Sequence, residues 1–187
     1  MPTAVFANQK AWKKWLKANH LASSGIWLQL AKKASGTPSV TYAEAVEIAL
    51  CYGWIDGQKQ SHSEVAWLQK FTPRGKKSIW SKINREKALA LIAGNKMQAA
   101  GLAEVERARQ DGRWEQAYDS PATAAVPPDL QAALDKSRRA KAFFATLESR
   151  NRYAILWRVQ TAKKPETRAK RIIQCMEMLE RGEKFHL

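Results

Sequence analysis

A stretch rich in Pro, Ala and Ser, YDSPATAAVPP at residues 118–128, separates two parts of the chain that carry different hydrophobic patterns. Such a composition is typical of a linker. Before it, apolar residues recur with both helical and strand periods, and after it only the helical period continues. The 187-residue sequence is therefore predicted to be α+β, with an α+β domain over 1–117, a linker over 118–126 and an all-helical module over 127–187.

Start and stop signals place the elements of the first part. Asn8 is predicted to cap a helix that runs to about Asn19, and Thr41 with Glu44 has the spacing of a capping box for a second helix. Alternating apolar residues predict a strand at 25–33, and WIDGQKQ and EVAWLQKF predict a hairpin over 54–71 with a bend at Asp56-Gly57. These strands are expected to form a small antiparallel sheet, followed by helices that end near residues 94 and 109.

The second part carries helical signals throughout. Pro128 can occupy the first position of one helix, and Pro165 the first turn of the last helix. Between them, KAFFATL and SRNRYAILWRVQ place aromatic and aliphatic residues on one side of each helix.

Positive charge is the dominant electrostatic feature, with a formal net charge of +15. The charge is concentrated, because residues 59–96 contain nine Lys or Arg and two acids, and residues 136–171 contain twelve and two. Such a field attracts polyanions. The partner is expected to be an anionic ligand or protein, and nucleic acid is possible.

Cysteine and histidine usage argues against disulfides and metal sites. Cys51 and Cys175 lie among apolar neighbours, which favours buried thiols in a reducing compartment. His20, His62 and His186 are far apart, and none pairs with another ligand at metal-binding spacing. The chain also shows no apolar run that would span a membrane and no signal-peptide pattern. We expect a cytoplasmic protein with no membrane insertion, cofactor or metal.

The segment FTPRGKKSIWSKIN, residues 71–84, is the most specific candidate for ligand binding. Pro73 and Gly75 are predicted to shape a turn, Ser78 or Ser81 can cap the next helix, and a helix start favours anions. The alternative is a simple cap with solvated lysines. The predicted anion-binding set is Trp54, Asp56, Arg74, Lys77, Ser78, Trp80, Lys82 and Asn84.

Two other functions remain open. The basic C-terminal helices suit phosphate contacts, with Tyr153 and Trp157 available for base stacking. The predicted nucleic-acid set is Arg150, Arg152, Arg158, Lys163, Lys164, Arg168, Lys170 and Arg171. An enzyme that uses Asp56 or Glu44 would need a carboxylate with a raised pKa in a pocket, whereas Asp56-Gly57 also suits an ordinary Asx-turn. No residue is assigned a catalytic role.

Four motifs together resemble the YdeI/OmpD-associated (OmdA-like) family, also called the bacteriocin-protection family: GWIDGQ, FTPRGKKSIWSKIN, SRNRYAILWRVQTAKKPETRAKRI and MLERGEK. The resemblance extends from about residue 8 to the C-terminus. It implies that the short helical family module corresponds to 127–187, and that the preceding part is loosely similar to YdhG-type domains. It also implies a link to bacteriocin tolerance and to an outer-membrane porin, with no established catalytic residues or cofactor. We expect a stress or bacteriocin-protection role. The expected function is non-enzymatic binding.

Overall fold

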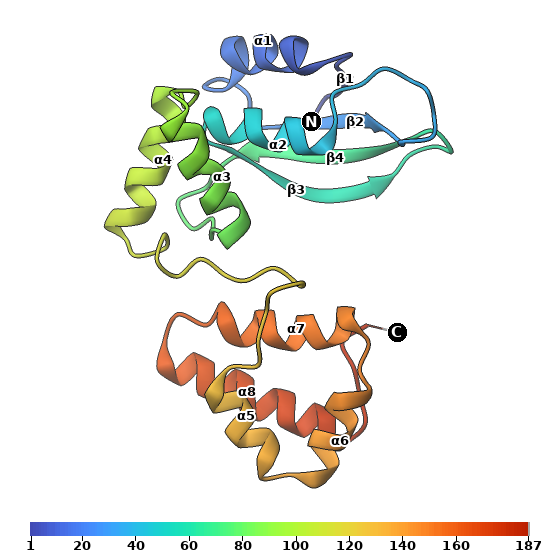
Figure 1. Cartoon of the computed structure of the whole chain (residues 1–187), viewed down its shortest axis with the longest axis vertical. Coiled ribbons are helices and arrows are strands. Elements are labelled where there is room, and N and C mark those ends of the chain that lie inside the picture. Colours follow the sequence, from blue (N-terminus) through green and yellow to red (C-terminus); the bar gives the residue numbers. More distant parts are fainter. Residues whose placement is uncertain (187) are drawn as a thin grey trace. The chain divides into compact units, whose positions relative to one another are not determined.

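The computed structural model describes residues 1–186, which divide into two compact units. The N-terminal unit comprises Met1–Trp80 and Asn84–Glu115, and the C-terminal unit comprises Ser81–Ile83 and the chain from Gln116 onward. The first contains a sheet and helices, and the second is helical (Figure 1). The predicted α+β class is therefore confirmed.

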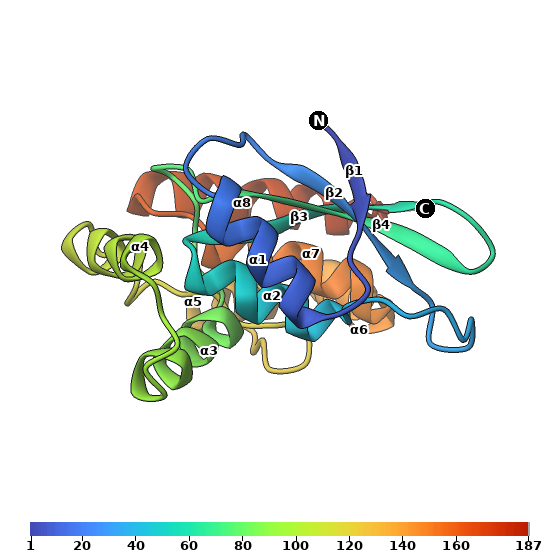
Figure 2. The ribbon, with the colours of Figure 1, turned by 90° about the horizontal axis from the view of Figure 1, so that it is seen from above.

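The elements of the N-terminal part alternate between helix and strand. They are β1 (Thr3–Val5), α1 (Gln9–Asn19), β2 (Ile26–Ala31), α2 (Tyr42–Cys51), β3 (Trp54–Ser61), β4 (Ala66–Pro73), α3 (Lys82–Ala93) and α4 (Ala99–Gln110). The strands form one sheet in the order β1-β2-β4-β3. Helices α1 and α2 lie over one face of this sheet (Figures 1 and 2).

The sheet is mixed, so the prediction of an antiparallel sheet was wrong for one strand pair. The pairs β2–β4 and β3–β4 are antiparallel, but β1 runs parallel to β2, with Ala4 opposite Leu28. Strand β1 has three residues, Thr3–Val5, too few for an alternating pattern to stand out. Its pairing depends on a partner more than twenty positions away in the sequence, which local patterns do not reveal.

The core of the N-terminal unit lies between the sheet and its helices. Ile26, Leu28 and Leu30 of β2 are buried, as the alternating pattern predicts. Trp12 of α1 is fully buried, its ring centroid lies 5.6 Å from that of Phe71, and its indole N–H donates to the carbonyl of Ala45. Each large apolar side chain buried in this way contributes about 1.5–3 kcal/mol.

Both predicted helix starts are confirmed. The Asn8 side chain accepts a hydrogen bond from the amide of Ala11. The capping box at α2 is complete, because Thr41 Oγ1 accepts from the Glu44 amide and the Glu44 carboxylate accepts from the Thr41 amide. The hydrogen bond from the Thr41 backbone is the main cause that lowers the pKa of Glu44. Glu44 is therefore engaged in holding the helix start.

The expected bend at Asp56-Gly57 is a β-bulge inside β3. Asp56 pairs with Phe71 and Lys59 pairs with Gln69, so that two residues of β3 stand opposite one residue of β4. Gln69 is buried, and its side-chain amide donates to the carbonyl oxygens of Gly57 at 2.8 Å and Gln58 at 3.2 Å. These bonds tie the side chain of Gln69 on β4 to the two bulged residues of β3.

The C-terminal unit is helical, as predicted, and its helices pack around one apolar cluster. They are α5 (Pro128–Asp135), α6 (Arg138–Thr146), α7 (Ser149–Gln160) and α8 (Pro165–Glu180). Pro128 and Pro165 occupy the first helical turns, and Ser137 accepts a cap hydrogen bond from Ala140. The cluster includes Leu130, Leu134, Phe144, Ile155, Val159 and Leu179.

Both cysteines are free and buried, as expected from their apolar neighbours. Burial raises the pKa of the Cys51 and Cys175 thiols. Within the described residues, no group of three or more His, Cys, Asp or Glu side chains could hold a metal ion. None of the described helices is long and apolar enough to cross a membrane.

Candidate functional site

The loop between β4 and α3 contains the core of the predicted anion site. Helix α3 begins at Lys82, so Ser78 lies four residues ahead of it. The Ser78 hydroxyl accepts a hydrogen bond from the Gly75 amide at 3.0 Å, and the Ser78 amide donates to the Gly75 carbonyl at 2.9 Å. Ser78 thus closes the Gly75–Ser78 turn, and Lys76 and Lys77 are exposed within that turn.

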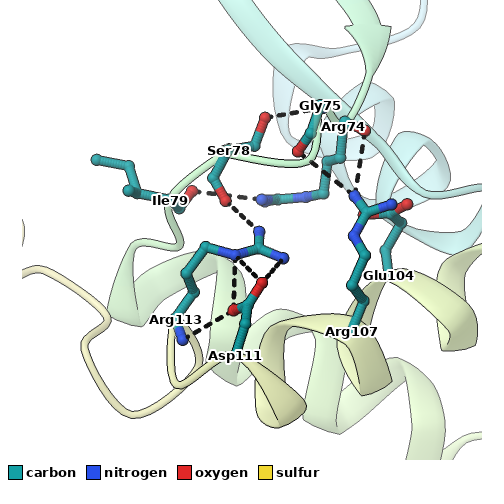
Figure 3. A network of polar contacts seen from close by, with 8 residues as sticks. All are labelled: Arg74, Gly75, Ser78, Ile79, Glu104, Arg107, Asp111 and Arg113. Carbon is teal, nitrogen blue, oxygen red and sulfur yellow. Dashed lines mark hydrogen bonds and ion pairs between the residues drawn. The ribbon is translucent and has the colours of Figure 1, made fainter.

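Arg74 is buried beneath this loop, with 5% of its surface exposed. Its guanidinium carbon lies 3.6 Å from the ring centroid of Trp80, and its Nη1 donates to the carbonyl of Ile79 at 3.3 Å (Figure 3). Stacking on Trp and donation to a carbonyl suit the planar, weakly hydrated guanidinium. Arg74 therefore supports the loop from inside.

Arg113 holds the same loop from the turn after α4. It is 2% exposed, and its Nη1 donates to the carbonyl of Ser78 at 2.6 Å. Its Nε lies 2.8 Å from both carboxylate oxygens of Asp111 (Figure 3). The buried positive charge is thus compensated by an ion pair with a residue two positions away.

A third arginine completes the arrangement. Arg107 of α4 donates to the carbonyls of Arg74 and Gly75 at 3.5 and 3.4 Å and pairs with Glu104. Burial raises the pKa of Glu104, while Arg107, Arg74 and Arg113 oppose that shift in this order. We call Arg74, Arg107, Arg113, Glu104 and Asp111 the arginine network (Figure 3).

The remaining predicted ligands lie in different surroundings. The indole of Trp54 is buried and donates to the carbonyl of His20. Asp56 accepts a hydrogen bond from the Tyr42 hydroxyl at 2.7 Å. Lys82 pairs with Asp119 at 2.7 Å in the C-terminal unit, and Asn84 lies in the first turn of α3. The structure thus brings Arg74, Ser78 and Trp80 together at one loop. The other predicted ligands described in this paragraph lie elsewhere.

Sequence reasoning missed four of the five residues of the arginine network. Glu104, Arg107, Asp111 and Arg113 stand about thirty positions from the loop they hold. No spacing rule connects them to it. One sequence signal was available: the segments around Trp80 and Trp114 are both rich in charged residues. In the structure the ring centroids of these two tryptophans lie 4.9 Å apart.

The predicted nucleic-acid set is also divided by the structure. Arg168 pairs with Asp129 at 2.6 Å and donates to the Val159 carbonyl, and Arg171 donates to the Arg158 carbonyl. Arg152 lies 4.7 Å from the ring centroid of Phe144. Lys163, Lys164 and Lys170 have exposed side chains. Arg150 and Arg158 line a pocket.

This α7 pocket has a volume of about 610 Å³ and lies within the C-terminal unit. Three aromatic side chains and three basic ones line it, and none of the described lining residues is acidic. Trp157 and Phe185 expose 38% and 39% of their surfaces, unusual for residues of this size. The lining residues are Pro121, Ser149, Arg150, Tyr153, Ala154, Trp157, Arg158, Phe185 and His186.

Two local features build this pocket. Positions 150, 153, 154, 157 and 158 lie on one face of α7, because they follow the three- and four-residue spacing of a helix. The opposite wall is held by Asn151, which is buried and bonds the backbone of His186 in both directions, at 3.1 and 2.8 Å. The guanidinium of Arg158 lies 5.0 Å from the ring centroid of Phe185.

Tyr153 gives a testable pH dependence. Its hydroxyl donates to the Asp119 carbonyl at 2.8 Å, and burial, then Tyr118 and Asp119, raises its pKa to about 12. An unfolded tyrosine titrates near 10, so the stability from protonated Tyr153 is fully present below pH 10 and is lost as the pH rises to about 12. An absorbance titration should show a tyrosinate step near pH 12 that is missing in Tyr153→Phe. An unchanged step would contradict the assignment.

Comparison with known families gives two matches. Residues 4–104 match a family described as a domain of unknown function (DUF8412). Residues 123–182 match the OmdA family, described as bacteriocin-protection, YdeI or OmpD-associated. The resemblance was expected over nearly the whole chain, but the OmdA match covers only this C-terminal part. No curated protein and no solved structure matched the chain. The chain therefore belongs to the DUF8412 family, whose model matches its N-terminal half, and its C-terminal part is similar to the YdeI/OmpD-associated family.

Proposed function

We propose that the chain is a non-enzymatic binding protein whose C-terminal unit binds an anionic ligand with a flat apolar group. The observation that supports this best is the α7 pocket, where Tyr153, Trp157 and Phe185 stand beside Arg150 and Arg158. Aromatic side chains offer large apolar surfaces to a planar group. Arginine binds carboxylate or phosphate through two parallel hydrogen bonds. The pocket thus offers both kinds of contact within one concave surface.

Three related probes separate these contributions. Adenosine carries the flat ring without charge, ribose 5-phosphate carries the anion without the ring, and AMP carries both. We expect AMP to bind more tightly than either of the others in calorimetric titrations of the full chain. Equal affinities for AMP and ribose 5-phosphate would contradict a role for the aromatic wall.

Substitutions in the α7 pocket test the site itself. Arg150→Gln or Arg158→Gln should weaken AMP binding about ten-fold, because each removes a charge-assisted contact. Trp157→Leu should weaken both AMP and adenosine. Lys170→Gln is the matched control, because it removes one exposed charge from α8 outside the described pocket lining. If the arginine variants and the control bind AMP equally, the proposed site is wrong.

Nucleic-acid binding is the second candidate. It is favoured by the exposed Lys163, Lys164 and Lys170, which belong to the same unit as the two arginines of the pocket. Binding to nucleic acid would weaken steeply with salt, because each neutralised phosphate releases counterions. A gel shift that is seen at low salt, disappears as the salt concentration rises, and is lost in a Lys163→Gln/Lys164→Gln variant would support nucleic-acid binding. The description of the OmdA family as bacteriocin-protection supports a further proposal, that the binding activity serves bacteriocin protection.

A further inference from the structure

We propose a second anion site, in the N-terminal unit, that binds the phosphoryl groups of a small phosphorylated ligand. The site is a pocket of about 500 Å³ at the end of the sheet. Its lining residues are Ala31, Lys32, Lys33, Lys59, Ser61 and Trp67, and we call it the lysine–tryptophan pocket. The described residues that line it differ from those that line the α7 pocket, so the two proposals can be tested independently.

The β-bulge in β3 decides which side chains reach this pocket. Paired residues of neighbouring strands lie on the same face of a sheet. Ser61 pairs with Trp67 and Lys59 pairs with Gln69, so Lys59 and Ser61 share the face of Trp67. Without the extra residue, the register would shift by one and place Gln58 and Gln60 there instead. The bulge therefore directs a cation and a hydroxyl toward Trp67.

The apolar core alone does not explain why the polar residue Gln69 is buried on this face. It is a buried polar residue, with 4% of its surface exposed, between strands that otherwise bury apolar side chains. Its amide donates to both carbonyls of the bulge, at Gly57 and Gln58. Bulges commonly re-aim a side chain at a functional site. Here the buried amide holds the bulge that positions Lys59.

The other two lysines enter from the end of β2. The amide of Lys32 donates to the Val65 carbonyl at 2.8 Å, which extends the ladder by one bond beyond Ala31. Lys32 and Lys33 follow directly on this fixed strand end and line the pocket. The three lysines thus come from strand β3 and from the segment that directly follows β2.

The charges around the pocket favour an anion. The Lys59 ammonium lies 4.4 Å from the ring centroid of Trp67, and Tyr42 contacts the same ring at 5.8 Å. None of the lining residues that the structure describes is acidic, and the Asp56 carboxylate accepts the hydrogen bond of Tyr42. Lysine binds phosphate as a point charge with rotatable donors. Closely spaced phosphoryl groups would satisfy all three lysines and the Ser61 hydroxyl together.

The test follows one indole signal in the full chain. In ¹H–¹⁵N spectra, Trp67→Phe identifies the indole resonance of Trp67 among the tryptophans. Titration with pyrophosphate should shift this resonance to saturation, and Lys59→Gln should weaken the response about ten-fold or more. Lys14→Gln removes the same charge from an exposed position on α1 and should leave it unchanged.

A charge-neutral variant makes the test independent of net charge. The double substitution Gln58→Lys/Lys59→Gln keeps the composition but moves the ammonium group to the bulged position. It should bind pyrophosphate as weakly as Lys59→Gln. A parallel titration with oligothymidylate shows whether the phosphoryl groups belong to a small molecule or to a nucleic-acid backbone.

Several results would overturn the proposal. They are a Trp67 resonance that pyrophosphate does not shift, a response to oligothymidylate alone, equal binding by Lys59→Gln and Lys14→Gln, and full binding by the exchanged variant. Binding of AMP at the α7 pocket has no bearing on these outcomes, since substitutions there leave the Trp67 signal intact.

Discussion

A Trp80→Ala variant is expected to lower the free energy of unfolding of the N-terminal unit by about 3–5 kcal/mol. The Trp80 side chain is 1% exposed and packs between the Arg74 guanidinium, 3.6 Å from its ring centroid, and the Trp114 ring at 4.9 Å. Truncation would leave a large cavity and remove the surface on which a buried arginine stacks. Denaturant unfolding monitored by circular dichroism measures the loss.

Trp80→Phe is the matched control. The indole Nε1 of Trp80 is buried and has no hydrogen-bond partner among the described residues, so a phenyl ring sacrifices no hydrogen bond there. We expect less than half the loss of the alanine variant, because the ring over Arg74 is kept. If both variants lose equal stability, the stacking on Arg74 is not what holds the loop.

Arg113→Met is expected to cost about 2–3 kcal/mol and to release the Gly75–Ser78 turn. The substitution removes the donor to the carbonyl of the half-buried Ser78 and leaves that acceptor without its bond from Arg113. The larger penalty of a broken, fully buried ion pair is not expected, since the Asp111 side chain is 44% exposed and regains water. The loss should therefore stay below that of Trp80→Ala.

Limited trypsin digestion reports the release of the loop. Lys76 and Lys77 lie in the exposed turn, and a mobile loop tip is cleaved faster than an anchored one. The control is Arg109→Met, which removes the same charge from an exposed site 5.3 Å from the Trp114 centroid and should cost at most about 1 kcal/mol. Equal cleavage of the two variants would contradict the anchoring role of Arg113.

The helix starts were predictable because their signals are local. Asn8, Thr41 and Glu44 act on backbone amides within three residues, so their spacing alone identifies them. The buried side of β2 was predictable for the same reason, because Ile26, Leu28 and Leu30 alternate along one short segment. Strand β1 was not, since its three residues gain meaning only from the parallel neighbour.

The candidate sites were predictable only in part. The sequence pattern singled out the segment 71–84 as a candidate site, but it indicated neither that Arg74 is buried nor which groups accept its hydrogen bonds. The backbone carbonyl groups of the loop need hydrogen-bond donors. Arg107 of α4 and Arg113 of the turn after it supply them, at Gly75 and Ser78. Which cations remain at the surface depends on such long-range contacts.

The sequence by itself determined the α+β class, the helix boundaries set by caps and prolines, and the positive charge that favours an anionic partner. Only the tertiary structure decided where that charge acts. It turned Arg74 and Arg113 inward to hold a loop, and it gathered Arg150 and Arg158 at the α7 pocket. It also directed Lys59 toward Trp67 through a one-residue shift held by Gln69. Local signals act over a single helical turn, whereas strand register and buried hydrogen bonds depend on residues that meet only in the folded chain.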